Sequence, residues 1–210
     1  MASTAPRATY RHGDLRQALV DAGFAMARES GPDAVVLREA TRRAGVSPNA
    51  AYRHFADRTA LVQAVSDAAL GAVAEAIEEE WERIARAGDA AADAHAELEA
   101  VGVGYLRFAR DEPGLFRAAF TVPRDLRSAL SPDKAGPRGR TPFELLGIAL
   151  DDLVAAGELP AERRPGAELL AWSAVHGLAM LALEGPLHDL DPELARQTGR
   201  RVIAMVDRGL

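Results

Sequence analysis

The stretch of sequence that decides the fold runs from Gly45 to Arg58 and reads Gly-Val-Ser-Pro-Asn-Ala-Ala-Tyr-Arg-His-Phe-Ala-Asp-Arg. Ser47 is a favourable helix N-cap, because its hydroxyl can accept a hydrogen bond from a backbone N–H two or three residues later. Pro48 then falls at the first helical position, where its fixed φ suits a helix and its missing N–H costs nothing. Gly45 follows the periodic run 37–44 and can take the left-handed conformation that ends a helix. The stretch therefore predicts a helix, a tight turn and a second helix.

The second of these helices is short and has a polar outer face. Ala51 and Phe55, four residues apart, form its one apolar seam. The positions between and before them carry amide, phenol, guanidinium and imidazole groups. A small helix of this kind suits the recognition element of a helix-turn-helix, which enters the major groove of DNA.

The pattern continues on both sides of this unit. Apolar residues recur every three or four positions over 11–29, which predicts an amphipathic helix before the one at 37–44. Residues 1–10 are expected to be a disordered tail. Asp57 can cap a fourth helix, and its apolar spacing continues to about residue 87. We therefore expect a helix-turn-helix domain over 11–58, joined by the long fourth helix to a second domain over 59–210.

The second domain is predicted to be helical throughout. Apolar spacing predicts helices near 91–111, 115–120, 143–156, 165–183 and 192–207. The segment 123–142 is polar and rich in Pro and Gly, which makes it the best candidate for a disordered loop. No internal repeat and no period-two strand pattern is present, so the expected class is all-α.

Composition excludes several classes of function. The 210-residue chain has no cysteine, which excludes disulfides, thiol catalysis and thiolate metal sites. The start of the chain has no apolar core of a secretory signal and no run is long enough for a membrane span, so a cytoplasmic protein is expected. The histidines form no His-Glu-x-x-His pair and no phosphate-binding loop is present. We therefore expect neither a metal, nor a cofactor, nor an enzyme.

The net charge of −6 is unevenly distributed. Residues 1–58 hold nine arginines and six acidic residues, a net charge of +3, whereas the remainder carries −9. A basic N-terminal part can face phosphates while the acidic part keeps DNA away from other surfaces.

Residues 11–62 resemble the N-terminal domain of the TetR family of transcriptional repressors. The resemblance rests on Ala44-Gly45-Val46-Ser47, Ala51-Tyr52-Arg53-His54-Phe55, Asp57-Arg58 and Leu61, which follow the order and spacing of the family signature. Residues 172–177, Trp-Ser-Ala-Val-His-Gly, are similar to the Trp-x-x-x-His-Gly segment of the WHG type of C-terminal domain, and residues 105–116 resemble the segment that precedes it. The resemblance implies a three-helix DNA-binding domain followed by a helical domain for ligand binding and dimerisation.

Two positions depart from the family pattern. Val36 stands where Thr or Ser is usual, so the helix after it loses a side-chain cap and a phosphate contact. Ala40-Thr41 replaces an apolar-Ala pair, which leaves a smaller and more polar seam against the recognition helix.

The resemblance implies contacts to base edges from Arg38 and from residues 47–50, and contacts to phosphates from the next helical turn. Side-chain chemistry agrees, because an asparagine can bond adenine bidentately and an arginine can bond guanine. Tyr52 could instead be partly core, and Arg53 a solvated charge. The expected DNA-binding residues are Arg38, Ser47, Pro48, Asn49, Ala50, Tyr52, Arg53, His54 and Arg58.

The resemblance also implies an effector pocket among the middle helices. The alternative for each candidate is plain core, and His176 could bond either an effector or a neighbouring helix. The candidate lining residues are Trp81, Tyr105, Phe108, Phe116, Phe120, Leu146, Leu150, Trp172, Val175, His176 and Met180.

A three-helix unit reads only a few base pairs, so useful affinity requires two copies on a palindromic operator. In the family, the last two helices of each subunit form a four-helix bundle. The alternative for the small and apolar residues on these helices is internal core. The expected interface residues are Leu170, Ser173, Ala174, Gly177, Leu178, Leu181, Val202, Ile203 and Val206.

Together these features predict a sequence-specific transcriptional regulator, a homodimeric repressor released from a double-stranded DNA operator by a small apolar effector. The fourth helix would carry the signal between the effector pocket and the head. The alternative is a helical small-molecule-binding protein whose head no longer docks on DNA.

Overall fold

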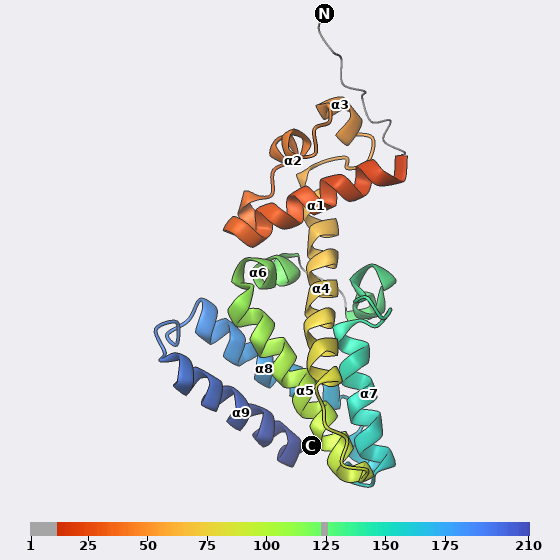
Figure 1. Cartoon of the computed structure of the whole chain (residues 1–210), viewed down its shortest axis with the longest axis vertical. Coiled ribbons are helices and arrows are strands. Elements are labelled where there is room, and N and C mark those ends of the chain that lie inside the picture. The colour runs from red at the N-terminus through yellow and green to blue at the C-terminus, as the bar shows by residue number, and fades with distance from the viewer. Residues whose placement is uncertain (1–11, 123–125) are drawn as a thin grey trace, which may run out of the picture.

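The computed structural model describes residues 12–122 and 126–210, which contain helices and turns but no strand (Figure 1). The predicted all-α class is thus confirmed, whereas the expected tail at 1–10 lies outside the described residues. In chain order the elements are α1 (His12–Ser30), η1 (Pro32–Ala34), α2 (Leu37–Arg43), α3 (Pro48–Ala51), α4 (Arg58–Glu82), α5 (Ala90–Asp111), α6 (Pro113–Thr121), η2 (Leu126–Leu130), η3 (Pro132–Lys134), α7 (Pro142–Ala155), η4 (Ala161–Arg163), α8 (Ala167–Leu183) and α9 (Pro192–Gly209).

The turn between α2 and α3 forms by the local chemistry that the sequence predicts. Gly45 has a φ of +69°, and the N–H of Val46 donates to the carbonyl of Thr41 at 3.0 Å, which closes the end of α2. The hydroxyl of Ser47 accepts from the N–H of Ala50 at 3.3 Å and caps α3. These bonds set the direction of α3 relative to α2.

The helix α4 connects the head to the rest of the molecule, as predicted. It begins at the cap Asp57, which accepts from the N–H of Ala60 at 2.8 Å, and runs down the middle of the body (Figure 1). It ends at Glu82, not near residue 87. Asp93 accepts from the N–H of Ala87 at 2.7 Å and draws the following segment toward the start of α5.

By length and composition alone α4 is apolar enough to cross a membrane, which is weak evidence because a buried core helix passes the same test. Within the protein, 56% of its most apolar window is buried. The helix packs against α1, α5, α6 and α7, so it serves here as a core helix.

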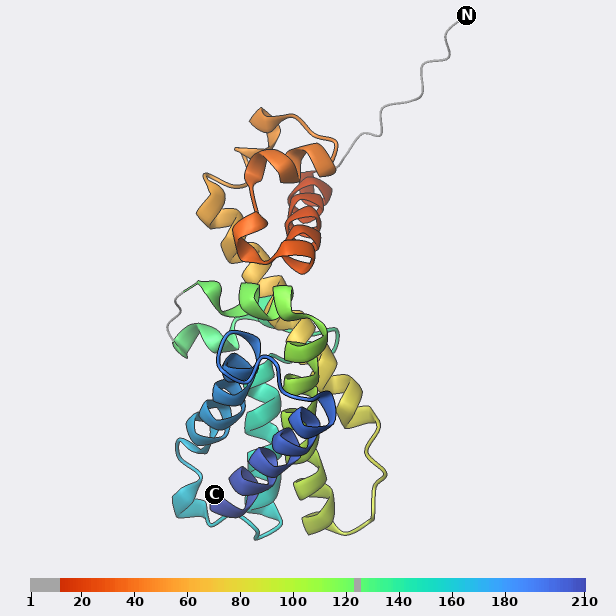
Figure 2. The same ribbon diagram turned by 90° about the vertical axis from the view of Figure 1, so that its left-hand side faces the viewer.

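The body places α5 at its centre, with α8 and α9 side by side on one face (Figure 2). Gly104 permits a close approach of α5 to α4, since a Cβ there would lie 2.7 Å from the Cα of Ile77. The end of α5 farthest from the head is tied by His95. Its Nδ1 lies 2.7 Å from a carboxylate oxygen of Asp207 in α9, and its Nε2 lies 3.3 Å from Glu158.

The expectation of a disordered loop at 123–142 is wrong for residues 126–142, and 123–125 lie outside the described residues. The described part forms η2 and η3, with Lys134 and Thr141 buried. Gly71 of α4 allows this segment to approach the helix closely, because a Cβ there would lie 2.8 Å from the carbonyl oxygen of Ala135. The Gly and Pro residues therefore make tight turns against α4.

Candidate DNA-binding head and ligand cavity

The outer surface of the head carries most of the predicted DNA-binding side chains. Arg38, Ser47, Pro48, Asn49 and Arg53 are exposed, whereas Ala50 and His54 are half-buried. Ala51 and Phe55 are buried on the inner side of α3, as predicted. Tyr52 is 59% exposed, which excludes the alternative that it is core. The head therefore presents a polar and cationic face around α3.

Both departures from the family pattern have structural consequences in α2. Val36 occupies the N-cap position with extended backbone, no side-chain cap, and a side chain 45% exposed. Thr41 is buried, but its hydroxyl donates to the carbonyl of Arg38 at 2.6 Å. The more polar seam is therefore satisfied, whereas the missing cap is not replaced.

The arginines at the end of α2 hold the head together. Arg42 and Arg43 donate to the carboxylate of Glu39, and these bonds lower the pKa of Glu39 to about 2. Arg43 also donates to Glu29 of α1 at 2.8 Å with two nitrogens. Their charges are thus already paired within the head, in agreement with a role on a solvated face.

Arg58 also has a structural role within the head. Its guanidinium donates to the carbonyls of Val35 at 2.8 Å and of Pro32 at 3.1 Å. These carbonyls belong to the connection between α1 and α2, so Arg58 fixes this connection to the start of α4. The predicted phosphate contact remains a prediction, and the side chain is still half exposed.

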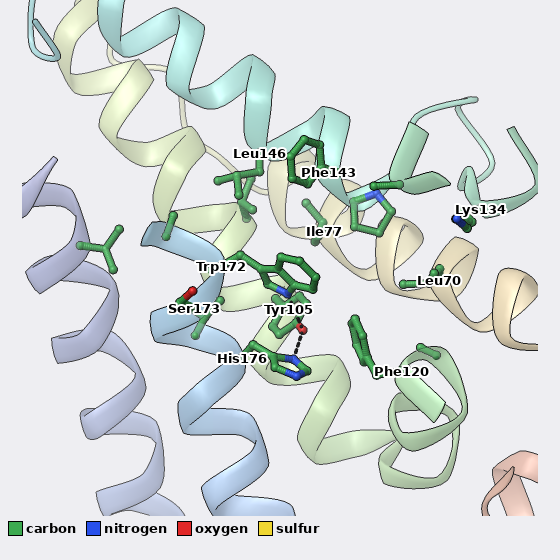
Figure 3. A pocket seen from close by; sticks show the side chains of 18 of the residues that line it. Leu70, Ile77, Tyr105, Phe120, Lys134, Phe143, Leu146, Trp172, Ser173 and His176 are labelled. Carbon is green, nitrogen blue, oxygen red and sulfur yellow. Dashed lines mark hydrogen bonds between the residues drawn. The ribbon is translucent and has the colours of Figure 1, made fainter. Parts of the chain in front are cut away.

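The body encloses a cavity of about 490 Å³ between α4, α5, α6, α7, α8 and α9 (Figure 3). Six predicted effector residues line it: Tyr105, Phe120, Leu146, Trp172, Val175 and His176. Five others do not line it and pack elsewhere in the body: Trp81, Phe108, Phe116, Leu150 and Met180. Their apolar side chains were consistent with either role, and here they contribute to the core.

A larger part of the cavity wall was not predicted from the sequence. From the helices these residues are Leu70, Ile77, Leu98, Val101, Gly102, Ala119, Pro142, Phe143, Ala171, Ser173, Ile203 and Val206, and from the segment between α6 and α7 they are Val122, Ser128, Ala129 and Lys134. Leu70 and Ile77 share a face of α4 at a spacing of seven, a signal that could have found them. The burial of the segment before α7 has no such local signal.

One chain of hydrogen bonds crosses the cavity wall from α8 to α5 and back. The indole Nε1 of Trp172 donates to the hydroxyl of Tyr105 at 3.2 Å, and this hydroxyl lies 2.7 Å from Nδ1 of His176. Because an indole can only donate, the phenol oxygen accepts there, and its own proton can be donated to Nδ1 when that nitrogen is unprotonated. His176 thus satisfies the neighbouring helix with one ring nitrogen.

The surroundings of these hydrogen bonds favour the neutral forms of Tyr105 and His176. Burial lowers the pKa of His176 and raises the pKa of Tyr105. The ring of His176 packs edge-on to Phe120 with centroids 4.7 Å apart (Figure 3). The neutral imidazole with Nδ1 accepting carries its proton on Nε2, and no described residue pairs with that nitrogen.

Comparison with known proteins decides the family. The model of bacterial regulatory proteins of the tetR family matches residues 19–65, and the model of the tetracyclin repressor-like C-terminal domain matches residues 98–206. The second match alone covers more than half of the chain. The chain belongs to the TetR family. It is therefore a DNA-binding transcription regulator, and residues 172–177 lie within the C-terminal match, where the WHG type is plausible.

Solved structures show the same fold for this TetR-family protein. A protein of unknown function from Rhodococcus sp. RHA1 superimposes with a TM-score of 0.69 at 25% identity, covering 97% of this chain and 99% of that one. A TetR family transcription regulator from Marinobacter aquaeolei VT8 gives a TM-score of 0.59 at 18% identity, with 91% and 93% covered. A putative tetR family regulator from Shewanella sp. PV-4 gives 0.57 at 16% identity, with 90% and 95% covered. None of the curated protein sequences matches the chain.

The outer face of α8 in this TetR-family protein exposes an apolar stripe. Leu170 is 64% and Leu181 45% exposed, and Ser173 and Gly177 lie on the same face, with Ala174 and Leu178 half-buried beside them. A Cβ at Gly177 would meet nothing within 4 Å, so this face has room for close contact. Val202 on α9 is half-buried.

One interface prediction on α9 needs correction. Ile203 is buried, and its side chain lies so close to α5 that a Cβ on Gly102 would be 2.7 Å from its Cγ1. Ile203 therefore offers no surface to a second subunit. Val206 is half-buried and lines the cavity, and its place in the interface stays a prediction.

The helix α6 links the cavity to the head. A Cβ at Gly114 would lie 2.3 Å from the carbonyl oxygen of Ala27 in α1. The carboxylate of Glu112, just before α6, pairs with Arg28 of α1 at 3.0 Å. At its other end α6 contributes Phe120 to the cavity wall. A displacement of the cavity wall at Phe120 can therefore reach α1 through α6.

Proposed function

We propose that this TetR-family protein is a homodimeric repressor, held on a palindromic DNA operator and released by a small, largely apolar ligand. The observation that carries the proposal is a mostly apolar cavity in the body, joined by α4 and α6 to a head with a polar face. The head would correspond to residues 11–58 and the ligand-binding and dimerisation domain to 59–210. The protein would act in the cytoplasm and catalyse no reaction. No metal-binding cluster was found among the described residues.

Base contact would come from the exposed side chains at the start of α3 and from Arg38 on α2. Asn49 can bond adenine bidentately and Arg38 can bond guanine, while Tyr52 and His54 lie one turn later, where they can bond phosphates. Arg53 offers a further cation on the same face. In this arrangement α3 reads the base sequence, and the turn that follows α3 positions the head on the DNA backbone.

Two heads would be brought to one operator by the exposed stripe on α8. Leucines at 170 and 181 flank the small residues Ser173 and Gly177, a pattern that permits close packing of two helices. Dimerisation would bury this apolar stripe and set the distance between the two recognition helices.

Ligand binding would favour one of two arrangements of the head relative to the body. A ligand that contacts Phe120 acts on α6, and α6 touches the backbone of α1 at Gly114. The buried Ser66 also joins α4 to α6, because its hydroxyl donates to the carbonyl of Ala119 at 3.0 Å. The ligand would release DNA by binding better to the arrangement whose heads do not fit the operator.

The test is binding of the purified protein to DNA from upstream of its own gene, across a salt series, with random DNA as the control. We expect specific binding whose affinity falls steeply with salt. Arg38→Ala and Asn49→Ala should each weaken specific binding by about 1–3 kcal/mol. Arg163→Ala removes a charge from the body and should leave specific binding unchanged. Equal loss with all three variants would contradict the proposal.

The alternative, a ligand-binding protein whose head does not dock on DNA, makes a different prediction. It would show no salt-dependent affinity for any DNA, including a fully randomised pool. The exposed cations and amide around α3 favour the repressor.

A further inference from the structure

The hydrogen-bond chain through Trp172, Tyr105 and His176 limits what the cavity can bind. The phenol oxygen accepts from Trp172 and lies 2.7 Å from Nδ1 of His176, to which it can donate its own proton. Among the described residues, the phenol hydroxyl has no other hydrogen-bond acceptor in reach. With the phenol as donor, Nδ1 of His176 accepts and the remaining proton of the neutral imidazole is on Nε2.

The cavity wall near His176 is mostly apolar, with Ser173 of α8 beside Trp172 and His176 (Figure 3). Phe120 lies against its ring at 4.7 Å, and Leu146 and Val175 belong to the same wall. The charged side chain in the wall, Lys134, lies on the opposite side of the cavity from Trp172 (Figure 3) and donates to the carbonyl of Ser128. At its aromatic end the cavity thus offers a ring nitrogen of His176, Nε2, that bonds to no described residue, in a wall made mostly of carbon atoms.

We propose that the ligand of this cavity is a neutral, largely apolar molecule with a hydrogen-bond acceptor, such as a carbonyl oxygen, that accepts from Nε2 of His176. This inference rests on the proposed ligand-binding role of the cavity and adds its chemical class. A ligand without an acceptor would leave the Nε2 proton buried and unpaired, which is costly in an apolar site. A cavity of about 490 Å³ lies within the range that accommodates small organic ligands.

The test uses pairs of probes that differ only in the acceptor. Benzophenone and 1,1-diphenylethylene have nearly the same shape, as do the smaller acetophenone and α-methylstyrene, but only the ketones accept a hydrogen bond. We expect NMR titrations of the full-length protein to show that at least one ketone binds about tenfold more tightly than its alkene. In His176→Phe this preference should reverse, because the carbonyl would then lose its water without gaining a donor. In His176→Gln, which keeps an N–H donor, part of the preference should return.

A measurement on the unmodified protein makes the test independent of how the variants fold. Nitrogen-15 spectra of the histidine side chains should show His176 neutral at pH 7 with its proton on Nε2. A ketone should shift the Nε2 resonance more than its alkene does. The proposal is overturned if the proton is on Nδ1, if neither ketone binds, or if the preference is the same in wild type and His176→Phe.

Failure of the repressor model would have a different signature. If ketones bind with the predicted preference but leave DNA affinity unchanged, the ligand class is upheld and release by that ligand is contradicted. If DNA is never bound specifically while the ketone preference holds, the repressor role alone is overturned.

Discussion

Val36 stands at the N-cap of α2 with an exposed isopropyl group and without an oxygen to accept from the free N–H groups of the first turn. By contrast, α3 and α4 are capped by Ser47 and Asp57. Single residues also tie distant helices together in the body, as His95 does between α5 and α9. At the residue scale, stability thus depends on a few polar groups that can be exchanged one at a time.

Val36→Thr should raise the free energy of unfolding by about 1 kcal/mol, because the new hydroxyl can cap α2. Chemical denaturation of the purified protein measures this change. Val36→Ala is the control, since it removes apolar surface without adding an acceptor. Equal stability of the Thr and Ala variants would show that the N-cap of α2 has no energetic role.

His95 should make stability depend on pH. Burial alone would lower the pKa of His95, but the hydrogen bonds to Asp207 and Glu158 outweigh it and raise the pKa above 6.5. A raised pKa in the folded state means that the protonated form stabilises the fold, fully below pH 6.5 and progressively less as pH rises through the folded-state pKa. The stability advantage of wild type over His95→Gln should therefore shrink between pH 6 and pH 9. An advantage that grows with pH would contradict the assignment.

At the scale of elements, the features that local chemistry determines could be predicted from the sequence. The boundaries of α1, α2 and α3 follow from Gly45, Ser47 and the apolar period, and all were predicted to within a few residues. The inward turn of Ile203 and the burial of Lys134 were not predicted, because each depends on a partner helix far away in the sequence. Half of the cavity candidates failed for the same reason, since an apolar side chain on a buried helix can face either a core or a cavity.

Gly114→Ala should disturb the contact between α6 and α1. The added methyl group would meet the carbonyl oxygens of Ala27 and Arg28 at 2.3 and 2.8 Å, and we expect a loss of about 1–3 kcal/mol in the free energy of unfolding. Gly147→Ala in α7 is the matched control, because its methyl would meet side-chain atoms only at 3.7 Å or more. That variant should gain up to about 1 kcal/mol from helix propensity. If Gly114→Ala is as stable as Gly147→Ala, the two helices are not in the contact described.

At the scale of the whole molecule, the elongated chain carries the head at one end and α8 on a side of the body (Figures 1 and 2). Family models match both the N-terminal and the C-terminal part of the chain. The contact between α6 and α1 connects the cavity wall to the head. In the proposed dimer, the second copy would cover the apolar stripe on α8 and place a second recognition helix.

Leu170→Asp should yield a folded monomer. The side chain is 64% exposed in one subunit, so the change costs the subunit little but places a charge in the proposed interface. Analytical ultracentrifugation measures the mass, and DNA titration should show the loss of tight operator binding. Leu130→Asp replaces an exposed leucine in η2 and should remain dimeric. A dimer that survives Leu170→Asp would place the interface elsewhere.

The central claim is that two heads read a symmetric DNA sequence, and selection from a randomised DNA pool tests it most directly. The account predicts one enriched palindromic site, bound by two subunits or a multiple of two, with an affinity that falls steeply with salt and is lost in Asn49→Ala. A pool in which no sequence is enriched, or a selected site bound by a single subunit, would contradict it.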